Sequence, residues 1–465
     1  MDAMNPFFEL PNKNPLRCHV FSLDNVPCNT FYSVSPFAEK LRNVCWQLKS
    51  VGHEVYYYGY DVCEVECDEK IEVITEDILL ESRPQAHKDR GYFNIKNELD
   101  RSDGSVHLER LWTVNAGYEF RKRYNPGDYC LWMLPGCGQR HLYAETCNLP
   151  VNHVEAGVGY NGAHLPYKVF ESMFIRNFHY GIYHANDFHV NNFDDEAKKQ
   201  LDNIHHYLYE CTDQNKVYHL DAVIPNSFDI SLFDFKIEKK GYLLYLARIF
   251  EGKGVKTAVE IAEKMKMKLI VAGPGDFEAE TGKQKDFSQY VEVLGPVGPE
   301  KRRELLSDAS AILCLTYPCE TFGNVAIEAM LSGTVPITSN NGGFLENIQN
   351  GYNGFRVNCN DVDEAIKAVE NIDKIDPHNL RKAGLRFSRE QVALQYNSYL
   401  QYLDRQVKGN ITDPSRSYYT RCWESSVIDG LDEIEWPTDW LRPIDNNAPK
   451  SIEDGDQTSE EKNDD

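Results

Sequence analysis

Two glutamates lie on either side of a glycine in one short stretch of the chain. Residues 317–333 read Tyr-Pro-Cys-Glu-Thr-Phe-Gly-Asn-Val-Ala-Ile-Glu-Ala-Met-Leu-Ser-Gly, so Glu320 precedes Gly323 and Glu328 follows it. Each carboxylate can accept hydrogen bonds from two hydroxyl groups at once. The pattern suits a ligand with hydroxyls on both sides of a phosphate, with Glu320 on a sugar and Glu328 on a ribose. Taken alone, either residue could equally be an ordinary surface acid.

The elements around these glutamates are predicted to be a strand, a loop and a helix. The apolar run 311–315 favours a strand, and the block 324–332 favours a helix that Gly333 would end. That helix is apolar enough to be largely buried, where an unpaired Glu328 would be costly. Gly323 would let the backbone approach a ligand, and the free N–H groups of the first helical turn suit phosphate.

A second loop carries two cations that could bind a diphosphate. Arg248 and Lys253 follow an apolar run at 242–246, which predicts a strand, and Gly252 and Gly254 lie beside them. Arg can bind phosphate through two nitrogens and Lys as a point charge. A solvated basic loop is the alternative, but two cations beside glycines in an acidic protein favour the binding site.

The segment 151–155 predicts a strand that runs directly into a glycine turn. Alternation places His153 and Glu155 on one face of this strand, and Gly157 follows. Open α/β sheets place ligand contacts at the carboxyl ends of their strands. We therefore expect a site here, with a hydrogen-bonded core histidine as the alternative for His153.

Four motifs, in their order along the chain, resemble the retaining GT-B glycosyltransferases of family 4. The most specific is Glu320, seven residues and Glu328, with Phe322-Gly323 between them. The others are Arg248 with Lys253-Gly254, then Gly342-Gly343 with Glu346 after the predicted strand 335–339, and then Asn353-Gly354-Phe355. The resemblance covers about residues 222–387 and is much looser before them.

This resemblance implies a GT-B fold, in which two Rossmann-like domains face each other across a cleft. It implies transfer of a sugar from a nucleotide-diphosphate-sugar to a hydroxyl, with retention at the anomeric carbon, in glycan or glycoconjugate synthesis. It implies no cofactor and no metal, because protein cations stabilise the departing diphosphate. The residues implied for catalysis are Glu320, Glu155, Arg248 and Lys253. Those implied for donor binding are Arg248, Lys253, Gly273, Phe322, Gly323, Asn324, Val325 and Glu328, with His153 and Gly157 as candidate contacts to the sugar or acceptor.

Before residue 230 the pattern predicts an α/β domain with unusual decoration. Residues 19–23, 36–49 and 54–58 predict a strand, a helix and a strand. The loop 24–35 lacks the glycines that many family members carry, so we expect it to face the acceptor. Residues 61–127 are polar and predict an irregular insertion.

The rest of this domain is predicted to contain a helix over 167–179, a strand over 181–184 and a last strand over 216–224. The domain boundaries predicted for the chain are 1–230 for an acceptor-side domain, 231–387 for a donor-binding domain, 388–408 for a helix that packs back on the first domain, 409–445 for an aromatic extension and 446–465 for a disordered acidic tail.

Composition limits the classes of partner. The 465 residues include 49 basic and 72 acidic side chains, and the net charge of −23 disfavours nucleic acid and anionic lipid surfaces. Thirteen cysteines, an odd number without repeated short spacing, indicate reduced thiols in the cytoplasm. We expect no transmembrane segment, because no apolar run of sufficient length occurs.

Other readings of the sequence stay open. A GT-A enzyme would use the acid pair Asp361 and Asp363 for a metal, although Asp361 also fits a helix cap. A zinc site could be built from the cysteine sets 63/67 or 130/137/147. The chain could instead bind a nucleotide-sugar without turnover, or glycosylate a hydroxylated base in nucleic acid through the basic residues 88–110 and 121–123.

Overall fold

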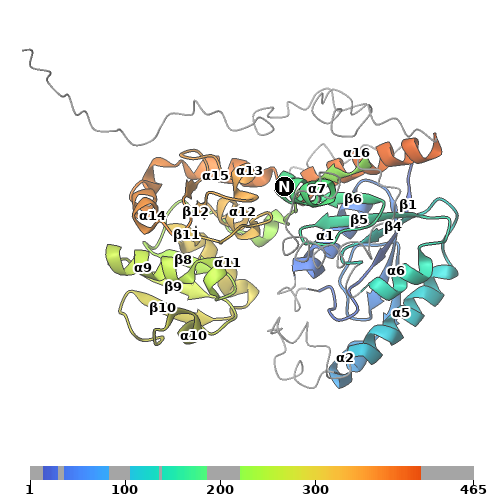
Figure 1. Ribbon diagram of the computed structural model, residues 1–465, viewed down its shortest axis with the longest axis horizontal. Helices are drawn as coiled ribbons and strands as arrows, with labels where there is room; N and C mark the ends of the chain where they lie inside the picture. Colours follow the sequence, from blue (N-terminus) through green and yellow to red (C-terminus); the bar gives the residue numbers. More distant parts are fainter. Residues whose placement is uncertain (1–13, 30–35, 83–104, 136–138, 186–219, 410–465) are drawn as a thin grey trace, which may run out of the picture.

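The computed structural model describes residues 14–29, 36–82, 105–135, 139–185 and 220–409. These residues form two parallel sheets with helices packed on them, side by side in Figure 1, which confirms the predicted GT-B class. The predicted aromatic extension after residue 409, the acidic tail and residues 30–35 of the loop after the first strand lie outside the described residues.

The first sheet has seven strands in the order β3-β2-β1-β4-β5-β6-β7. Its strands are β1 (Arg17–Phe21), β2 (Glu54–Tyr60), β3 (Glu69–Ile74), β4 (Tyr129–Trp132), β5 (Asn152–Val158), β6 (Tyr167–Phe170) and β7 (Ala222–Val223). Its helices are α1 (Pro36–Ser50), α2 (Glu76–Ser82), α5 (Ser105–Arg121), α6 (Arg140–Thr146) and α7 (Met173–Ala185). The central strands are buried on both faces, as parallel sheets covered by helices require.

The second sheet has six strands in the order β10-β9-β8-β11-β12-β13. Its strands are β8 (Leu243–Leu246), β9 (Leu269–Ala272), β10 (Val291–Gly295), β11 (Ala311–Cys314), β12 (Val335–Ser339) and β13 (Phe355–Val357). Its helices are α9 (Val255–Met265), α10 (Phe277–Thr281), α11 (Pro299–Asp308), α12 (Asn324–Leu331), α13 (Phe344–Asn347), α14 (Val362–Val369) and α15 (Pro377–Leu385). The strands predicted at 242–246 and 311–315 and the helix predicted at 324–332 are present as β8, β11 and α12.

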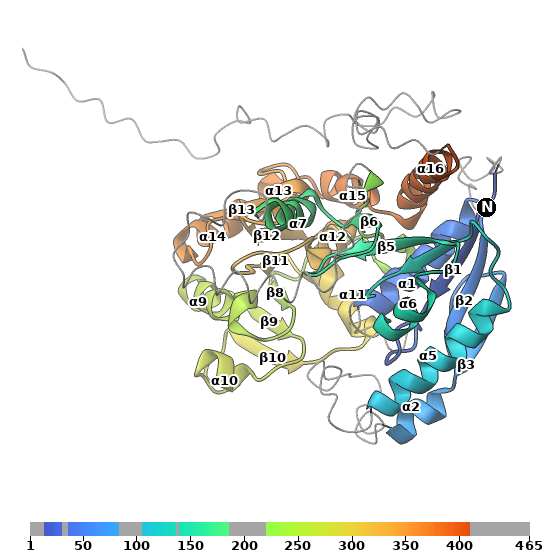
Figure 2. The same ribbon diagram turned by 45° about the vertical axis from the view of Figure 1, so that its right-hand side comes forward.

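Helix α16 (Arg389–Lys408) returns from the second domain to the first, and Figure 2 shows it near the strands of the first sheet. It packs against α1 and buries Val392, Tyr399 and Leu403 in the core of the first domain. The Tyr399 hydroxyl donates to the carbonyl of Leu220 at 3.0 Å. The chain passes between the domains twice, near Phe228 and near Phe387. These two segments are hydrogen-bonded to each other, because Phe228 N–H donates to the carbonyl of Phe387 at 2.9 Å.

The prediction of an irregular insertion over 61–127 is wrong for its described parts. β3 extends the first sheet at its edge, with Ile71 and Val73 buried and the glutamates between and before them exposed. α5 buries Trp112 and Phe120 completely. Charged side chains on the exposed faces of an edge strand and a surface helix hide the underlying periodicity. Residues 83–104, which contain most of the charged block, lie outside the described residues.

The predicted order of helix and strand over 167–184 is also wrong. Residues 167–170 form strand β6, and the helix α7 begins only at Met173. A run of four residues is too short for periodicity to separate a strand from a helix, and its aromatic and β-branched residues favour the strand. The final strand predicted over 216–224 is described only at Ala222–Val223.

None of the helices in the described ranges is long and apolar enough to cross a membrane.

His153 lies in the core of the first domain, near the amino end of β5. Its side chain is 5% exposed, and the indole N–H of Trp132 donates to its Nδ1 at 3.0 Å. Burial lowers the pKa of His153 to about 4. Because the ligand-binding edge of a parallel sheet is the carboxyl end, His153 occupies the core position that was the alternative to a sugar contact.

The buried His153 predicts a pH-dependent stability. Between pH 6.5 and 4 the ring is protonated in the unfolded chain but stays neutral in the folded one, so the free energy of unfolding falls as the pH falls. From pH 7 to pH 5 this group should account for a loss of about 2 kcal/mol. His153→Gln keeps an acceptor for Trp132 but does not titrate, so denaturant unfolding at the two pH values should show a smaller loss. His141→Gln, at a ring that is 63% exposed, is the control and should behave as the parent does. An equal loss in the parent and in His153→Gln would contradict the assignment.

Candidate active site

The loops after β8 and β11 meet at the carboxyl edge of the second sheet. Lys253, in a short 3₁₀ turn (Glu251–Lys253), forms an ion pair with the carboxylate of Glu320. Thr316 donates its hydroxyl to the same carboxylate at 3.0 Å, and Tyr317 N–H donates to the carbonyl of Gly252 at 2.7 Å. Lys253 and Glu320 were predicted from separate motifs, and the structure brings them together. Their side chains remain 23% and 19% exposed, so a ligand can reach both.

Arg248 lies on the same edge, directly after β8. Its side chain is exposed and its guanidinium is 5.4 Å from the centre of the Phe250 ring. No carboxylate of the described residues forms an ion pair with it. Gly273 packs closely against the start of this loop. A Cβ at this position would lie 1.8 Å from the carbonyl oxygen of Ala247, so the close approach needs a glycine. Gly273 therefore shapes the turn through its backbone, and Arg248 is a cation open to an anionic ligand.

Gly323 precedes α12 in a left-handed conformation that glycine adopts without strain. Its φ is +93°, and it precedes the first residue of the helix, Asn324. The backbone N–H groups of Asn324 and Val325 are the ones that a helix leaves without an internal acceptor. Phe322 is 2% exposed, so it packs under the turn and cannot contact a ligand through much of its ring.

Glu328 is held by a residue that sequence reasoning missed. Its carboxylate is 12% exposed and forms an ion pair with Arg302 of α11. Burial raises the pKa of Glu328, and Arg302 acts in the opposite direction. Nothing in the sequence separates Arg302 from its neighbour Arg303, which pairs with Asp234 instead. The pair Arg302 and Glu328 presents a partly exposed carboxylate next to the start of α12.

The predicted double-glycine loop supports Glu320. Gly343 N–H donates to the carbonyl of Glu320 at 2.8 Å. Gly342 has φ +57°, and a Cβ on it would lie 2.0 Å from the same carbonyl oxygen. Only glycine allows two backbone segments to come this close, so Gly342 fixes where Glu320 sits.

Glu155, predicted to be catalytic, is enclosed in the first domain. Its exposure is 0%, and its two oxygens accept hydrogen bonds from the hydroxyl of Tyr160 at 2.7 Å and the N–H groups of His164 and Leu165 at 2.8 and 2.9 Å. With these three donors it holds the loop after β5 in place. The structure does not bring Glu155 to the surface at which Lys253 and Glu320 meet, because all its hydrogen-bonding capacity is turned inward.

The first domain instead presents Lys40 and Glu171, which sequence reasoning did not select. Lys40 Nζ lies 2.5 Å from Glu171 and donates to the carbonyl of Gly157 at 3.0 Å. Gly157, predicted as a sugar or acceptor contact, has φ +63° and serves here as a backbone acceptor. The charged side chain beside the glycine turn after β5 is therefore Glu171, which follows the next strand β6, and local spacing cannot show this pairing.

The two domains touch through the segments that follow β11 and β12. Ser172 donates its hydroxyl to the carbonyl of Thr321 at 2.5 Å. Glu346, of the motif after the double glycine, accepts hydrogen bonds from the N–H groups of Met173 and Phe174 at 2.8 and 2.7 Å. A carboxylate from the second domain thus caps the first turn of α7 in the first.

Only parts of the alternative metal and nucleic-acid hypotheses fall on described residues, since Cys137 and residues 88–104 lie outside them. Asp361 accepts from the N–H of Glu364 at 2.9 Å as the cap of α14, and Asp363 is 81% exposed. Across the described residues, no group of three or more metal-binding side chains comes together. Lys122 and Arg123 pair with Glu119, which neutralises much of the basic cluster at 121–123.

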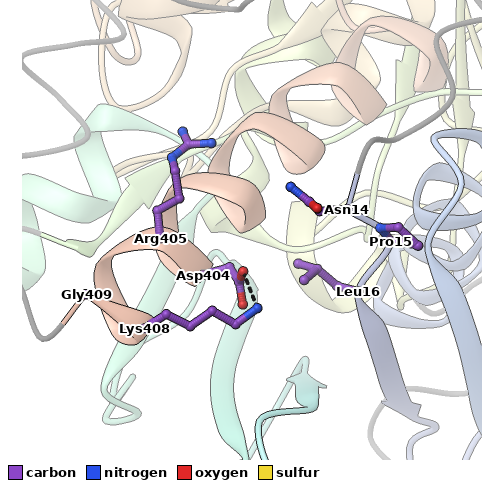
Figure 3. A pocket seen from close by; sticks show the side chains of 7 residues that line it. All are labelled: Asn14, Pro15, Leu16, Asp404, Arg405, Lys408 and Gly409. Atoms are coloured by element: carbon purple, nitrogen blue, oxygen red, sulfur yellow. Dashed lines mark hydrogen bonds and ion pairs between the residues drawn. The ribbon is translucent and has the colours of Figure 1, made fainter.

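A cavity of about 630 Å³ lies away from this site (Figure 3). It is lined by residues just before β1 and by the last turn of α16, where Lys408 pairs with Asp404 at 2.8 Å. This is the amino end of β1, opposite the carboxyl edge at which parallel sheets bind ligands. The cavity is therefore no part of the candidate active site.

The chain resembles known proteins mainly through its second domain. A family model described as glycosyl transferases group 1 matches residues 228–386. An uncharacterised glycosyltransferase of Methanocaldococcus jannaschii is 28% identical over 169 residues, 33% of this chain and 43% of that protein. Glycogen synthase of Mycobacterium tuberculosis is 28% identical over 163 residues, 32% of this chain and 39% of the synthase. The chain thus spans less than half the length of these curated relatives.

Solved structures extend the likeness to both domains. AviGT4, a glycosyltransferase involved in avilamycin A biosynthesis, aligns with a TM-score of 0.53 and 17% identity over 85% of this chain and 99% of its own. HepE of Anabaena, solved with UDP and glucose, aligns with a TM-score of 0.51 and 13% identity over 83% and 99% of the two chains. At these identities the likeness establishes the fold. Residues 228–386 therefore match the family model of the group 1 glycosyl transferases, within a chain of the GT-B fold.

Proposed function

We propose that this protein transfers a sugar from a nucleotide-diphosphate-sugar to an acceptor hydroxyl, with retention at the anomeric carbon. The observation that carries the proposal is the ion pair of Lys253 with Glu320 at the sheet edge where Gly323 precedes α12, with the exposed Arg248 in the loop after β8 on the same edge. Cations and helix N–H groups suit a diphosphate, and carboxylates suit hydroxyls. The group 1 match and a structural neighbour that binds UDP and glucose support the same ligand class.

The proposed chemistry rests on electrostatic stabilisation. The bond between the anomeric carbon and the diphosphate oxygen breaks, and the departing diphosphate is stabilised by Arg248, Lys253 and the N–H groups at the start of α12. The acceptor oxygen forms the new bond on the same face of the sugar and passes its proton to the leaving phosphate oxygen. Glu320 holds the sugar hydroxyls, and Glu328, fixed by Arg302, holds the ribose.

Removal of either diphosphate cation should lower the rate strongly. Arg248→Ala or Lys253→Ala leaves phosphate charge uncompensated as the bond breaks, at a cost of about 2–4 kcal/mol or about 10²–10³ in kcat/KM. Lys256→Ala is the control, because Lys256 is 49% exposed and pairs only with the exposed Glu251 among the described carboxylates. Turnover is measured across a panel of nucleotide-sugars. Near-parental turnover in both Arg248→Ala and Lys253→Ala would refute the site.

The two glutamates should affect different kinetic constants. The ribose is unchanged during the reaction, so Glu328→Gln should mainly weaken donor binding and raise KM. Charge develops on the sugar, so Glu320→Gln should mainly lower kcat. Calorimetry of donor binding alongside turnover separates the two effects. A protein that binds donor without turnover would show changes in affinity alone, and equal affinities and rates in the parent and both variants would exclude this stretch as the donor site.

We also propose that the transfer needs no divalent metal, since protein cations meet the diphosphate charge. Turnover in excess chelator should then equal turnover with added Mg²⁺ or Mn²⁺. A complete loss on chelation that Mn²⁺ restores would point to a metal site.

A further inference from the structure

Four polar side chains connect the first domain to the start of α12. Lys40 of α1 pairs with Glu171, which follows β6. The side-chain amide of Asn226 donates to Glu171 Oε2 at 2.8 Å and to Asn324 Oδ1 at 2.9 Å. Asn324 is the first residue of α12, so this hydrogen-bonded network ends at the turn that carries the proposed diphosphate site.

Three side chains of this hydrogen-bonded network are largely shielded from solvent. Glu171 is 4% and Asn226 8% exposed, and the side chain of Lys40 is 12% exposed. Removing a charge pair from water costs free energy that its mutual attraction often does not recover, so stability alone is a poor reason for such a pair. A buried pair of this kind is better suited to fixing one geometry.

The glycine turn after β5 makes room for Glu171. A Cβ on Gly159 would lie 2.1 Å from Glu171 Oε1, and Lys40 also bonds the carbonyl of Gly157. The φ angle of Gly159 is outside the left-handed region, so backbone conformation does not explain a glycine here. The missing side chain instead leaves room for the Glu171 carboxylate. The turn at the carboxyl end of β5 therefore sets where Glu171 meets Asn226.

Asn226 lies where the chain passes from the first domain to the second, and it bonds both. Among the described residues nothing else bonds the side chain of Asn324, so Asn226 alone sets its orientation. The same contact fixes the distance between the start of α12 and the first domain, where an acceptor would have to lie.

We infer that Asn226 and Glu171 are positioning residues for the transfer, which hold the start of α12 in register with the acceptor side of the first domain. This inference rests on the proposed function and adds residues to its site. The donor itself is bound by Arg248, Lys253 and the second domain. Loss of the positioning contacts should therefore lower kcat and leave donor affinity nearly unchanged.

Two substitutions test this by different routes. Asn226→Ala removes both hydrogen bonds. Gly159→Ala keeps every polar group but pushes the Glu171 carboxylate away, at the end of a flexible side chain that can shift. Each should lower kcat by about 10- to 100-fold, because small misplacements of reacting groups have effects of this size. Donor affinity by calorimetry should stay within about threefold of the parent, a change below 1 kcal/mol.

Asn226→Asp supplies a pH readout that a merely structural role would not give. Its carboxylate cannot donate, and the nearby Glu171 carboxylate raises its pKa, while Lys40 opposes this. Tyr396 of α16 also faces Glu171. Protonation restores one donor, so the ratio of variant to parent kcat should rise as the pH falls. A ratio that stays flat over the range in which the parent is stable would count against the inference.

Ser227→Ala is the matched control in the same segment. Its hydroxyl accepts from Gln47 of α1 at 2.7 Å, so the substitution removes one partly buried hydrogen bond between the linking segment and the first domain, outside the network. Its kcat should stay parental. Parental kcat in both Asn226→Ala and Gly159→Ala, or an equal loss in Ser227→Ala, overturns the inference while leaving the proposed function intact. A parent without turnover on any nucleotide-sugar overturns the proposed function, and the inference with it.

Discussion

The close approach of backbone segments at the carboxyl edge of the second sheet is the constraint on which the site depends. The carbonyl of Glu320 lies where a Cβ of residue 342 would be, and the N–H of Gly343 bonds that carbonyl. This contact fixes the loop after β11 against the loop after β12. Once Glu320 is fixed, Lys253 can pair with it across from the neighbouring loop, and Gly323 can begin α12 beside them. The candidate site is therefore shaped by how these loops pack at the edge of one sheet.

The first domain completes this arrangement from the other side. Glu346 caps the first turn of α7, and Ser172 bonds the carbonyl of Thr321, one residue after Glu320. A carboxylate at a helix N-terminus is favoured by the unpaired N–H groups there and by the helix dipole. Burial raises the pKa of Glu346, and the two N–H groups oppose this. The elements that shape the donor loops are thus the same ones that hold the domains together.

The sequence allowed prediction of the second domain almost completely and of the first only in outline. In the second domain each functional residue follows its own strand by a few positions, so β11, the turn at Gly323 and α12 could be predicted in order. Arg302 could not, because its partnership with Glu328 depends on how α11 packs against α12. A run of charged residues on an exposed helix contains no sign of which one turns inward.

The first domain shows the same limit more strongly. Glu155 sits at a strand end before a glycine turn, yet its oxygens bond the loop that follows, and the acid that bonds Lys40 and Asn226 is Glu171. The two glutamates differ in their partners. Glu155 accepts hydrogen bonds from the loop that follows it, whereas Glu171 pairs with Lys40 and accepts from Asn226. The pairings of Glu171 join residues more than fifty positions apart. Periodicity and local spacing cannot specify them, and the tertiary fold decides.

The ion pairs of the donor side have a consequence for how the proposed ligand would bind. Lys253 is neutralised by Glu320 and Arg302 by Glu328, so in the described residues Arg248 and the start of α12 are the groups that would first attract a diphosphate. A phosphate that reaches Lys253 competes with Glu320 for the same ammonium group. As Lys253 turns to the phosphate, oxygens of Glu320 become free to accept from sugar hydroxyls. In the proposed function, binding of the diphosphate and recognition of the sugar are therefore coupled through one exchange of partners. A free nucleotide that meets Lys253 but brings no hydroxyls to Glu320 would take away the cationic partner of this carboxylate and leave it the Thr316 hydroxyl, which favours the complete donor over the bare diphosphate.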